Sequence, residues 1–242
     1  MLALTLIQLC AREYQDIAYE RIARDATSAT STNQQNWLDL LNSAQRAVVL
    51  ARPDANAVTE SVLLVAGTKQ TLPAGAYRLL DVTRNMGVAG TTAGDTIRLA
   101  ERDVQDMVNR SWHGATAAAA TTVVRDVFYN DKKDPLVYWV KPKIPTSPAV
   151  YIEITTSKAP TDVAIADVAT GNITISDAYA GPMQEWMLFR AYMMATQALN
   201  QFQRAQFHLA TFFNLLGIKM KNDMFESPNA PDIFPAVASG GR

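Results

Sequence analysis

The residues most able to do chemistry in this 242-residue chain are one cysteine and two histidines, Cys10, His113 and His208. A zinc site needs about four Cys, His or carboxylate ligands at characteristic spacings, and these three residues supply too few. His113 has no nearby Cys, His or carboxylate pair, and His208 lies among apolar neighbours. We interpret both histidines as structural and expect neither a metal nor another cofactor.

Two other segments contain residue types that occur in catalytic sites. Gly67-Thr68-Lys69 resembles the end of a phosphate-binding loop, but the earlier glycine is missing and Leu-Pro follows instead of a helix. Asp131 and Asp134 flank a turn, where aspartate is favoured for its local backbone hydrogen bonds. The serine-hydrolase elbow and the His-Glu-x-x-His zinc motif do not occur. The sequence therefore predicts a protein that is not an enzyme.

The amino-acid composition excludes further classes of protein. Apolar residues make up 48% of the chain and charged residues 19%, with 22 basic against 23 acidic side chains. Such a chain is not intrinsically disordered. A protein whose main work is to hold DNA by its phosphates carries a clear excess of Lys and Arg. We therefore expect a folded protein without tight DNA binding.

The N-terminus could be mistaken for a targeting segment. Leu2 to Cys10 is apolar, but no basic region precedes it and no small-residue cleavage site follows it. Its apolar residues recur at helical spacing over 3–24, which predicts a helix. No other segment has the length and apolarity needed to cross a membrane, so we expect no membrane partner.

The elements expected along the chain form three groups. A second helix begins near Thr32 and is ended by Pro53, which gives an N-terminal helical hairpin. We then expect a turn at 66–73 and a hairpin built from 163–168 and 173–176. β-Branched and aromatic residues predict the other strands at 58–65, 78–83, 121–129, 136–140 and 150–155, with a strand end and short helix at 97–108.

A long C-terminal helix over 182–216 is the most informative element that the pattern predicts. Proline at its first position and Gly217 after its end mark its limits. Apolar residues recur between them every three or four positions, with only Gln206 breaking the series: Leu188, Tyr192, Ala195, Leu199, Phe202, Leu209, Phe213 and Leu216. Its other faces carry few charges, whereas a solvated face normally carries Lys and Glu. We expect this face, with Gln197, Gln201 and Arg204, to contact a neighbouring copy of the chain.

The last residues contain prolines and isolated apolar side chains that cannot build a core of their own. We interpret residues 218–242 as an extended arm that docks into a partner, with a frayed terminus as the alternative. The side chains expected to make that contact are Met224, Phe225, Pro228, Pro231, Ile233 and Phe234.

Together these elements predict an α+β fold. We expect a helical bundle, made by the N-terminal hairpin and the long C-terminal helix, with an inserted, mostly antiparallel β region and an extended C-terminal arm. The expected divisions are 1–53 with 179–217 for the bundle, 54–178 for the β region and 218–242 for the arm.

The order of six sequence segments resembles the head-to-tail adaptor, or head completion, proteins of tailed phages over nearly the whole chain. These segments are Trp37 to Gln45, Val62 to Pro73, Arg78 to Gly87, Val127 to Asp131, Pro142 to Pro145 and Val150 to Pro160.

The resemblance implies a structural virion protein that is assembled in the host cytoplasm. It implies a homo-oligomeric ring of about twelve copies beneath the portal, which extends the DNA channel and serves as a platform for the tail or nozzle protein. It also implies that the C-terminal arm binds the portal. Genomic DNA would pass without sequence-specific contacts, as the near-neutral charge of the chain allows.

Three alternatives remain open at this point. The chain could be another virion subunit, such as a tail-tube or stopper protein. It could be a particle-associated enzyme, for which no constellation of site residues is found. It could also be a monomeric α+β binding module.

Overall fold

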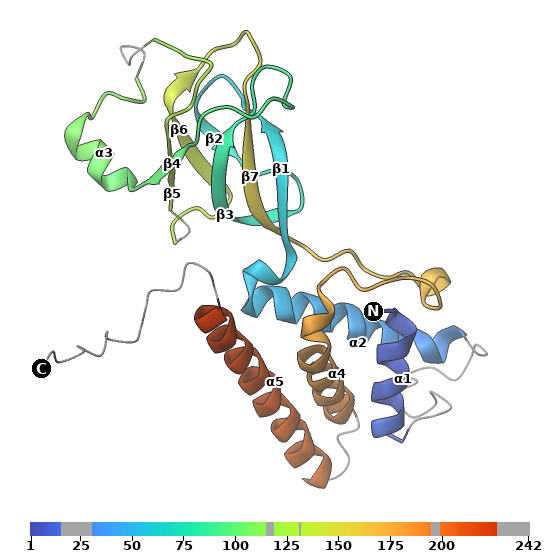
Figure 1. Ribbon diagram of the computed structural model, residues 1–242. Coiled ribbons are helices and arrows are strands. Elements are labelled where there is room, and N and C mark those ends of the chain that lie inside the picture. Colours follow the sequence, from blue (N-terminus) through green and yellow to red (C-terminus); the bar gives the residue numbers. More distant parts are fainter. Residues whose placement is uncertain (16–30, 115–118, 131, 195–198, 227–242) are drawn as a thin grey trace, which may run out of the picture. The chain divides into compact units, whose positions relative to one another are not determined.

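The computed structural model describes residues 1–15, 31–114, 119–130, 132–194 and 199–226 (Figure 1). The chain divides into two compact units. The helical unit comprises Met1–Gln45, Val163–Ile173 and Asp177–Arg242, and the β unit comprises Arg46–Asp162 and Thr174–Ser176.

The helical unit contains four α-helices: α1 (Ala3–Glu13), α2 (Ser31–Ala51), α4 (Ala180–Met194) and α5 (Leu199–Glu226). The last residues of α2 belong to the β unit. Because the apolar residues of α1 recur every three or four positions, the helix has one buried face. On that face Cys10 Sγ lies 3.7 Å from Met187 Sδ on α4, and the ring centroid of Tyr14 lies 4.8 Å from that of Tyr192.

A buried asparagine connects α2 to the segment that leads into α4. Asn42 Nδ2 donates to the carbonyl of Val163 over 3.1 Å, and Asn42 Oδ1 accepts from the Val163 amide over 3.0 Å. One side chain thus satisfies both backbone groups of Val163, as a neighbouring β-strand would.

The expected single helix over 182–216 is wrong. Helix α4 ends at Met194 and α5 begins at Leu199, and the two helices pack against each other. The ring centroids of Trp186 and Phe212 are 5.1 Å apart, and those of Tyr192 and His208 are 5.3 Å apart. Because a later residue of α4 meets an earlier one of α5, the pair is antiparallel. The apolar spacing continues through both helices and gives no sign of the break.

The expected helix end at Gly217 is also wrong. Helix α5 continues to Glu226, so nine residues assigned to an extended arm are helical. Glycine in a helix costs about 1 kcal/mol relative to alanine, which a long packed helix can absorb.

The β unit contains two sheets (Figure 1). In the first, β1 (Ala57–Leu63), β7 (Tyr151–Lys158) and β3 (Ala76–Asn85) pair antiparallel in the order β1-β7-β3. In the second, the order is β2 (Gly67–Thr71), β6 (Val137–Ile144), β5 (Asp126–Tyr129) and β4 (Arg98–Ala100), with only β4 and β5 parallel. Helix α3 (Arg102–Val108) follows β4, and short 3-10 helices lie at Pro53–Asn56, Ile165–Asp167 and Asp177–Tyr179.

One hydrophobic core joins the two sheets. Ile152 and Ile154 of β7 in the first sheet belong to the same buried cluster as Val127 of β5 and Tyr138 and Val140 of β6 in the second. The buried positions alternate along β7 from Ile152 to Thr156, which is the period of a strand with one face against a core.

Two local predictions in and around the β unit are wrong. Residues 67–71 form strand β2 instead of part of a turn, and their polar character fits a strand at the edge of its sheet. Gln70 is buried there and exchanges two hydrogen bonds, each 2.8 Å long, with the backbone of Val65. The expected hairpin at 163–176 is instead a 3-10 helix at Ile165–Asp167, followed by a turn at 168–170.

The predicted fold class also requires correction. The fold is α+β, but it is not a helical bundle with a subordinate β insertion. Two sheets, of three and four strands, form a compact unit with its own core. The sequence patterns located most of the strands but did not show that they pair as two sheets around a core of their own.

Candidate functional site

Helix α5, the second helix of the α4–α5 pair, exposes three large aromatic side chains. Phe202, Phe207 and Phe213 of α5 are 47%, 66% and 57% exposed. Phe202 and Phe213 are eleven residues apart, which is about three helical turns and about 16 Å, so they lie along one line of the helix. Phe207 lies about 140° around the helix from Phe202. We call the band that these residues define, with Gln203, Gln206, Ala210 and Asn214, the α5 face.

The α5 face is unusually poor in charge. Between Gln201 and Gly217, Arg204 is the only Asp, Glu, Lys or Arg residue. Exposed aromatic side chains beside amides are typical of a surface that another protein covers, because covering them removes apolar area from water at a small cost in charge desolvation. The arrangement is therefore suited to protein–protein contact.

The opposite side of α5 anchors the helix to α4. Ala205, His208, Phe212 and Leu216 are buried. His208 Nδ1 lies 2.7 Å from Glu185 Oε2 on α4, and the imidazole stacks on Tyr192 with an interplanar angle of 7°. His208 is thus a structural residue, as the sequence indicates.

Two of the three residues predicted for the subunit contact lie on α5 and differ in their exposure. Arg204 is exposed, and its guanidinium carbon lies 6.0 Å from the Tyr192 ring centroid. Gln201 is only partly exposed, and its Oε1 atom is buried without a hydrogen-bond partner among the described residues. Gln197 lies outside the described residues.

Of the residues predicted for the portal-binding arm, Met224 and Phe225 lie in the last turns of α5. Pro228, Pro231, Ile233 and Phe234 lie outside the described residues.

Sequence reasoning missed the α5 face itself. It placed Phe202 and Phe213 in the buried stripe of a single helix, and it did not consider Phe207. The signal that could have found them is the excess of apolar residues in 199–216. A helix with one buried stripe leaves two or three large aromatics on its other side only if something else covers them.

The other residues considered for chemistry, His113 and Cys10, lie in surroundings that favour a structural role. His113 Nδ1 lies 3.0 Å from Thr68 Oγ1, and its ring is 3.5 Å from that of Trp112. Burial, with Arg102 nearby, lowers the pKa of His113. Burial raises the pKa of the Cys10 thiol, so this cysteine is unsuited to act as a nucleophile.

No group of three or more His, Cys, Asp or Glu side chains that could hold a metal ion occurs in the described parts of the chain. A search of the same residues finds no helix that is long and apolar enough to span a membrane.

The exposed aromatic side chains of the α5 face are typical of the class of proteins that work by contact with other proteins. The sequence matches the model of the SU10 adaptor protein family over residues 1–232, and the chain therefore belongs to that family. No curated protein matches the sequence. The resemblance to phage head-to-tail adaptors is confirmed. The chain is a structural adaptor protein of a phage particle, and membership of a structural family supports the expectation that it is not an enzyme.

Proposed function

We propose that copies of this chain form a closed ring of about twelve beneath the portal of the phage head, with the α5 face of each copy packed on the next. The observation that carries this proposal is the exposure of Phe202, Phe207 and Phe213 on α5. Between Gln201 and Gly217 this helix has a single charged residue, Arg204. The family match over residues 1–232 supplies the adaptor role.

The C-terminal residues are proposed to attach the ring to the portal. Met224 and Phe225 lie in the last turn of α5, which ends at Glu226. Pro228, Pro231, Ile233 and Phe234 follow in a segment with too few apolar residues for a core. Apolar side chains on such a segment gain stability by entering a groove of a partner. The other end of the ring would receive the tail or nozzle protein.

The charge of the chain supports a channel through which DNA moves. Each phosphate contact by Lys or Arg adds to the binding free energy, so a basic channel wall would slow the passage of the genome. With a net charge of −1, the chain has no excess of basic residues for such a grip. We propose that the genome passes through the ring without a strong electrostatic hold and, as the resemblance to phage adaptors implies, without sequence-specific contacts.

The proposal is tested by mixing the purified chain with portal rings from the same phage and measuring the mass of the complex. We expect a discrete complex that contains about one adaptor per portal subunit. A chain that stays monomeric in the presence of portal would contradict the proposal and would favour a monomeric binding module. Self-assembly that ignores the portal would favour a tail-tube or stopper subunit.

A further inference from the structure

The helical unit has a second exposed apolar surface, on α1. Leu2, which caps the start of α1, is 42% exposed and Leu9 is 43% exposed. Thr5 lies exposed between them, about 140° around the helix from the buried Cys10. Residues three and four positions apart share one side of a helix, and Ala3 to Ala11 include no charged side chain. We call the strip formed by Leu2, Thr5 and Leu9 the α1 face.

The α1 face and the α5 face lie on opposite sides of the helical unit. On α4, Met187 meets Cys10 of α1 over 3.7 Å, and Glu185 meets His208 of α5 over 2.7 Å. Positions two residues apart point about 200° apart around a helix, so α4 lies between α1 and α5, as Figure 1 shows. The large ring of Tyr192, nearer the end of α4, reaches both neighbours.

Two different surfaces on opposite sides of one subunit are what a closed ring requires. In a ring of more than two copies each contact is heterologous, which means that one surface of a subunit packs on a different surface of the next. A surface that packs on its own copy produces a two-fold dimer instead. In the proposed ring the α5 face therefore needs a partner surface elsewhere on the chain, and the α1 face is placed to be that surface.

The α1 face also matches the α5 face in chemical character. A charged side chain pressed against Phe202, Phe207 or Phe213 would lose its water without gaining an ion pair, which is costly. The α1 face instead offers leucine and threonine side chains, and a leucine against a phenylalanine removes apolar surface from water on both sides of the contact.

The few charges beside the two faces are complementary. Arg204 is the charged residue beside the α5 face, and Glu13 is exposed at the end of α1, where its carboxylate accepts a hydrogen bond of 2.7 Å from Gln184. Both lie at the level of Tyr192 on α4. The Arg204 guanidinium carbon is 6.0 Å from the Tyr192 ring centroid, and the ring of Tyr14, which follows Glu13, is 4.8 Å from it. Opposite charges at the rim of a contact contribute to its specificity.

We propose that the α5 face of one copy packs on the α1 face of the next copy, with Leu9 against the phenylalanines and Glu13 toward Arg204. Each copy then uses α5 toward one neighbour and α1 toward the other. The proposal rests on the ring proposed above and adds which surface covers the α5 face.

Disulfide trapping in the portal complex tests this pairing. Thr5→Cys is introduced into one preparation of the full-length chain, and Gln203→Cys, Ala210→Cys or Asn214→Cys into a second one. All four positions are exposed, and the three sites on α5 scan the register along the helix. Equal amounts of the two preparations are assembled on portal and treated with oxidised glutathione. We expect a cross-linked dimer of the chain for at least one of the three pairs.

The matched controls are the four single variants, each assembled on portal alone. In the proposed contact an α1 face never meets another α1 face, and an α5 face never meets another α5 face. Each single variant should therefore cross-link at least about tenfold more slowly than the best mixed pair. The single variants also report any reaction of Cys10, which is buried.

Cross-linking of an α5 variant alone at the rate of the best mixed pair would overturn the proposal, because α5 would then pack on α5. A portal complex of the expected mass in which none of the three mixed pairs cross-links would also overturn it, and would leave the ring itself in place. Failure of the unsubstituted chain to assemble on portal would contradict the proposed function and the pairing together.

Discussion

His208 of α5 and Glu185 of α4 form a mostly buried pair in which Nδ1 and Oε2 are 2.7 Å apart, with 10% and 19% of the side chains exposed. The imidazole also lies flat on Tyr192, with ring centroids 5.3 Å apart. A hydrogen bond to a charged group and an aromatic stack thus act on one side chain. They fix the register of α5 on α4, and that register determines which aromatic residues α5 turns outward.

The first prediction concerns this pair. His208→Ala should lower the free energy of unfolding by about 2–4 kcal/mol, because it removes the stack and leaves the Glu185 carboxylate without its partner in a mostly buried position. Glu185→Gln keeps a hydrogen-bonding side chain and should cost about 1 kcal/mol. Chemical denaturation measures both. An equal effect of His208→Ala and of the exposed variant Gln206→Ala would refute this role.

The second prediction separates assembly from folding. Phe202→Ser, Phe207→Ser and Phe213→Ser should each change the unfolding free energy by no more than about 0.5 kcal/mol, because these side chains are exposed in the single chain. Each should weaken association on the portal by about 2 kcal/mol or more if it lies at the centre of the subunit contact. Sedimentation with portal and denaturation of the free chain provide the two measurements.

Phe212 provides the matched control for that series, because it is the same residue type on the buried side of the same helix. Phe212→Ser should destabilise the free chain by at least about 3 kcal/mol. Loss of stability in all four variants alike would mean that the three exposed rings have a structural role and do not form an assembly surface.

The third prediction concerns the C-terminal segment. Because α5 continues to Glu226, the informative deletion begins at Ser227. Removal of 227–242 should leave the thermal unfolding of the chain unchanged within a few degrees and should abolish co-sedimentation with portal. Undiminished co-sedimentation would show that the attachment lies elsewhere.

The fourth prediction concerns Asn42, whose amide makes both hydrogen bonds to the backbone of Val163. Asn42→Ala should cost about 2–4 kcal/mol in unfolding free energy, because it leaves a buried N–H and a buried carbonyl without partners. Asn42→Asp keeps the acceptor but loses the donor and places a buried carboxylate oxygen opposite the Val163 carbonyl, so we expect a cost at least as large. Hydrogen exchange at the Val163 amide should become faster in both variants. Protection as strong as in the parent chain would argue against a stabilising role for these two hydrogen bonds.

The fifth prediction uses the single thiol. Burial raises the pKa of Cys10, so the reactive thiolate is scarce at neutral pH and the sulfur is also inaccessible. An aromatic disulfide reagent should modify Cys10 at least about a hundredfold more slowly in the native chain than in denaturant. Rapid modification without denaturant would mean that α1 separates readily from α4.

The sequence predicts the strand positions well where a strand lies against the core. In β7 the alternation of Ile152, Ile154 and Thr156 follows the burial of the strand, so the pattern and the structure agree. The prediction from sequence fails for β2. This edge strand has the sequence Gly-Thr-Lys-Gln-Thr, which shows neither an alternation of apolar and polar residues nor β-branched apolar residues. Nothing local distinguishes it from a turn.

The α4–α5 pair shows a different limit of prediction from sequence. Apolar spacing tells which residues share a stripe, but it does not tell whether one helix or two carry that stripe. In the sequence, Tyr192, Ala195 and Leu199 fit a continuous period, although α4 ends at Met194 and α5 begins at Leu199. The low charge of the region, in contrast, is a property of composition and is independent of the break. The expectation of a protein-contacting face therefore remains a proposal. The sequence assigned this face to Gln197, Gln201 and Arg204, whereas the proposal from the structure rests on the exposed Phe202, Phe207 and Phe213.

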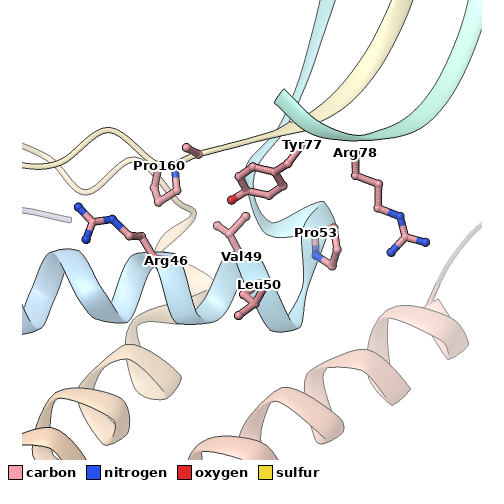
Figure 2. Close-up of a pocket in the computed structure, with 8 residues that line it drawn as sticks. Arg46, Val49, Leu50, Pro53, Tyr77, Arg78 and Pro160 are labelled. Atoms are coloured by element: carbon pink, nitrogen blue, oxygen red, sulfur yellow. The ribbon is translucent and has the colours of Figure 1, made fainter. Parts of the chain in front are cut away.

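The apolar pocket of the β unit that is lined by Arg46, Val49, Leu50, Pro53, Tyr77, Arg78, Ala159 and Pro160 (Figure 2) could not be found from the sequence. Its walls come from residues 46–53, 77–78 and 159–160, which are far apart in the chain and meet only because β3 pairs with β7. Each of these residues taken alone has an ordinary surface or core role.

The measurement that tests the central claim most directly is an electron cryo-microscopy reconstruction of the chain bound to its portal, at a resolution that shows aromatic side chains. The account predicts a closed ring in which Phe202, Phe207 and Phe213 of each copy are covered by the next copy. A ring, or a single bound chain, in which these three side chains remain open to solvent would contradict it.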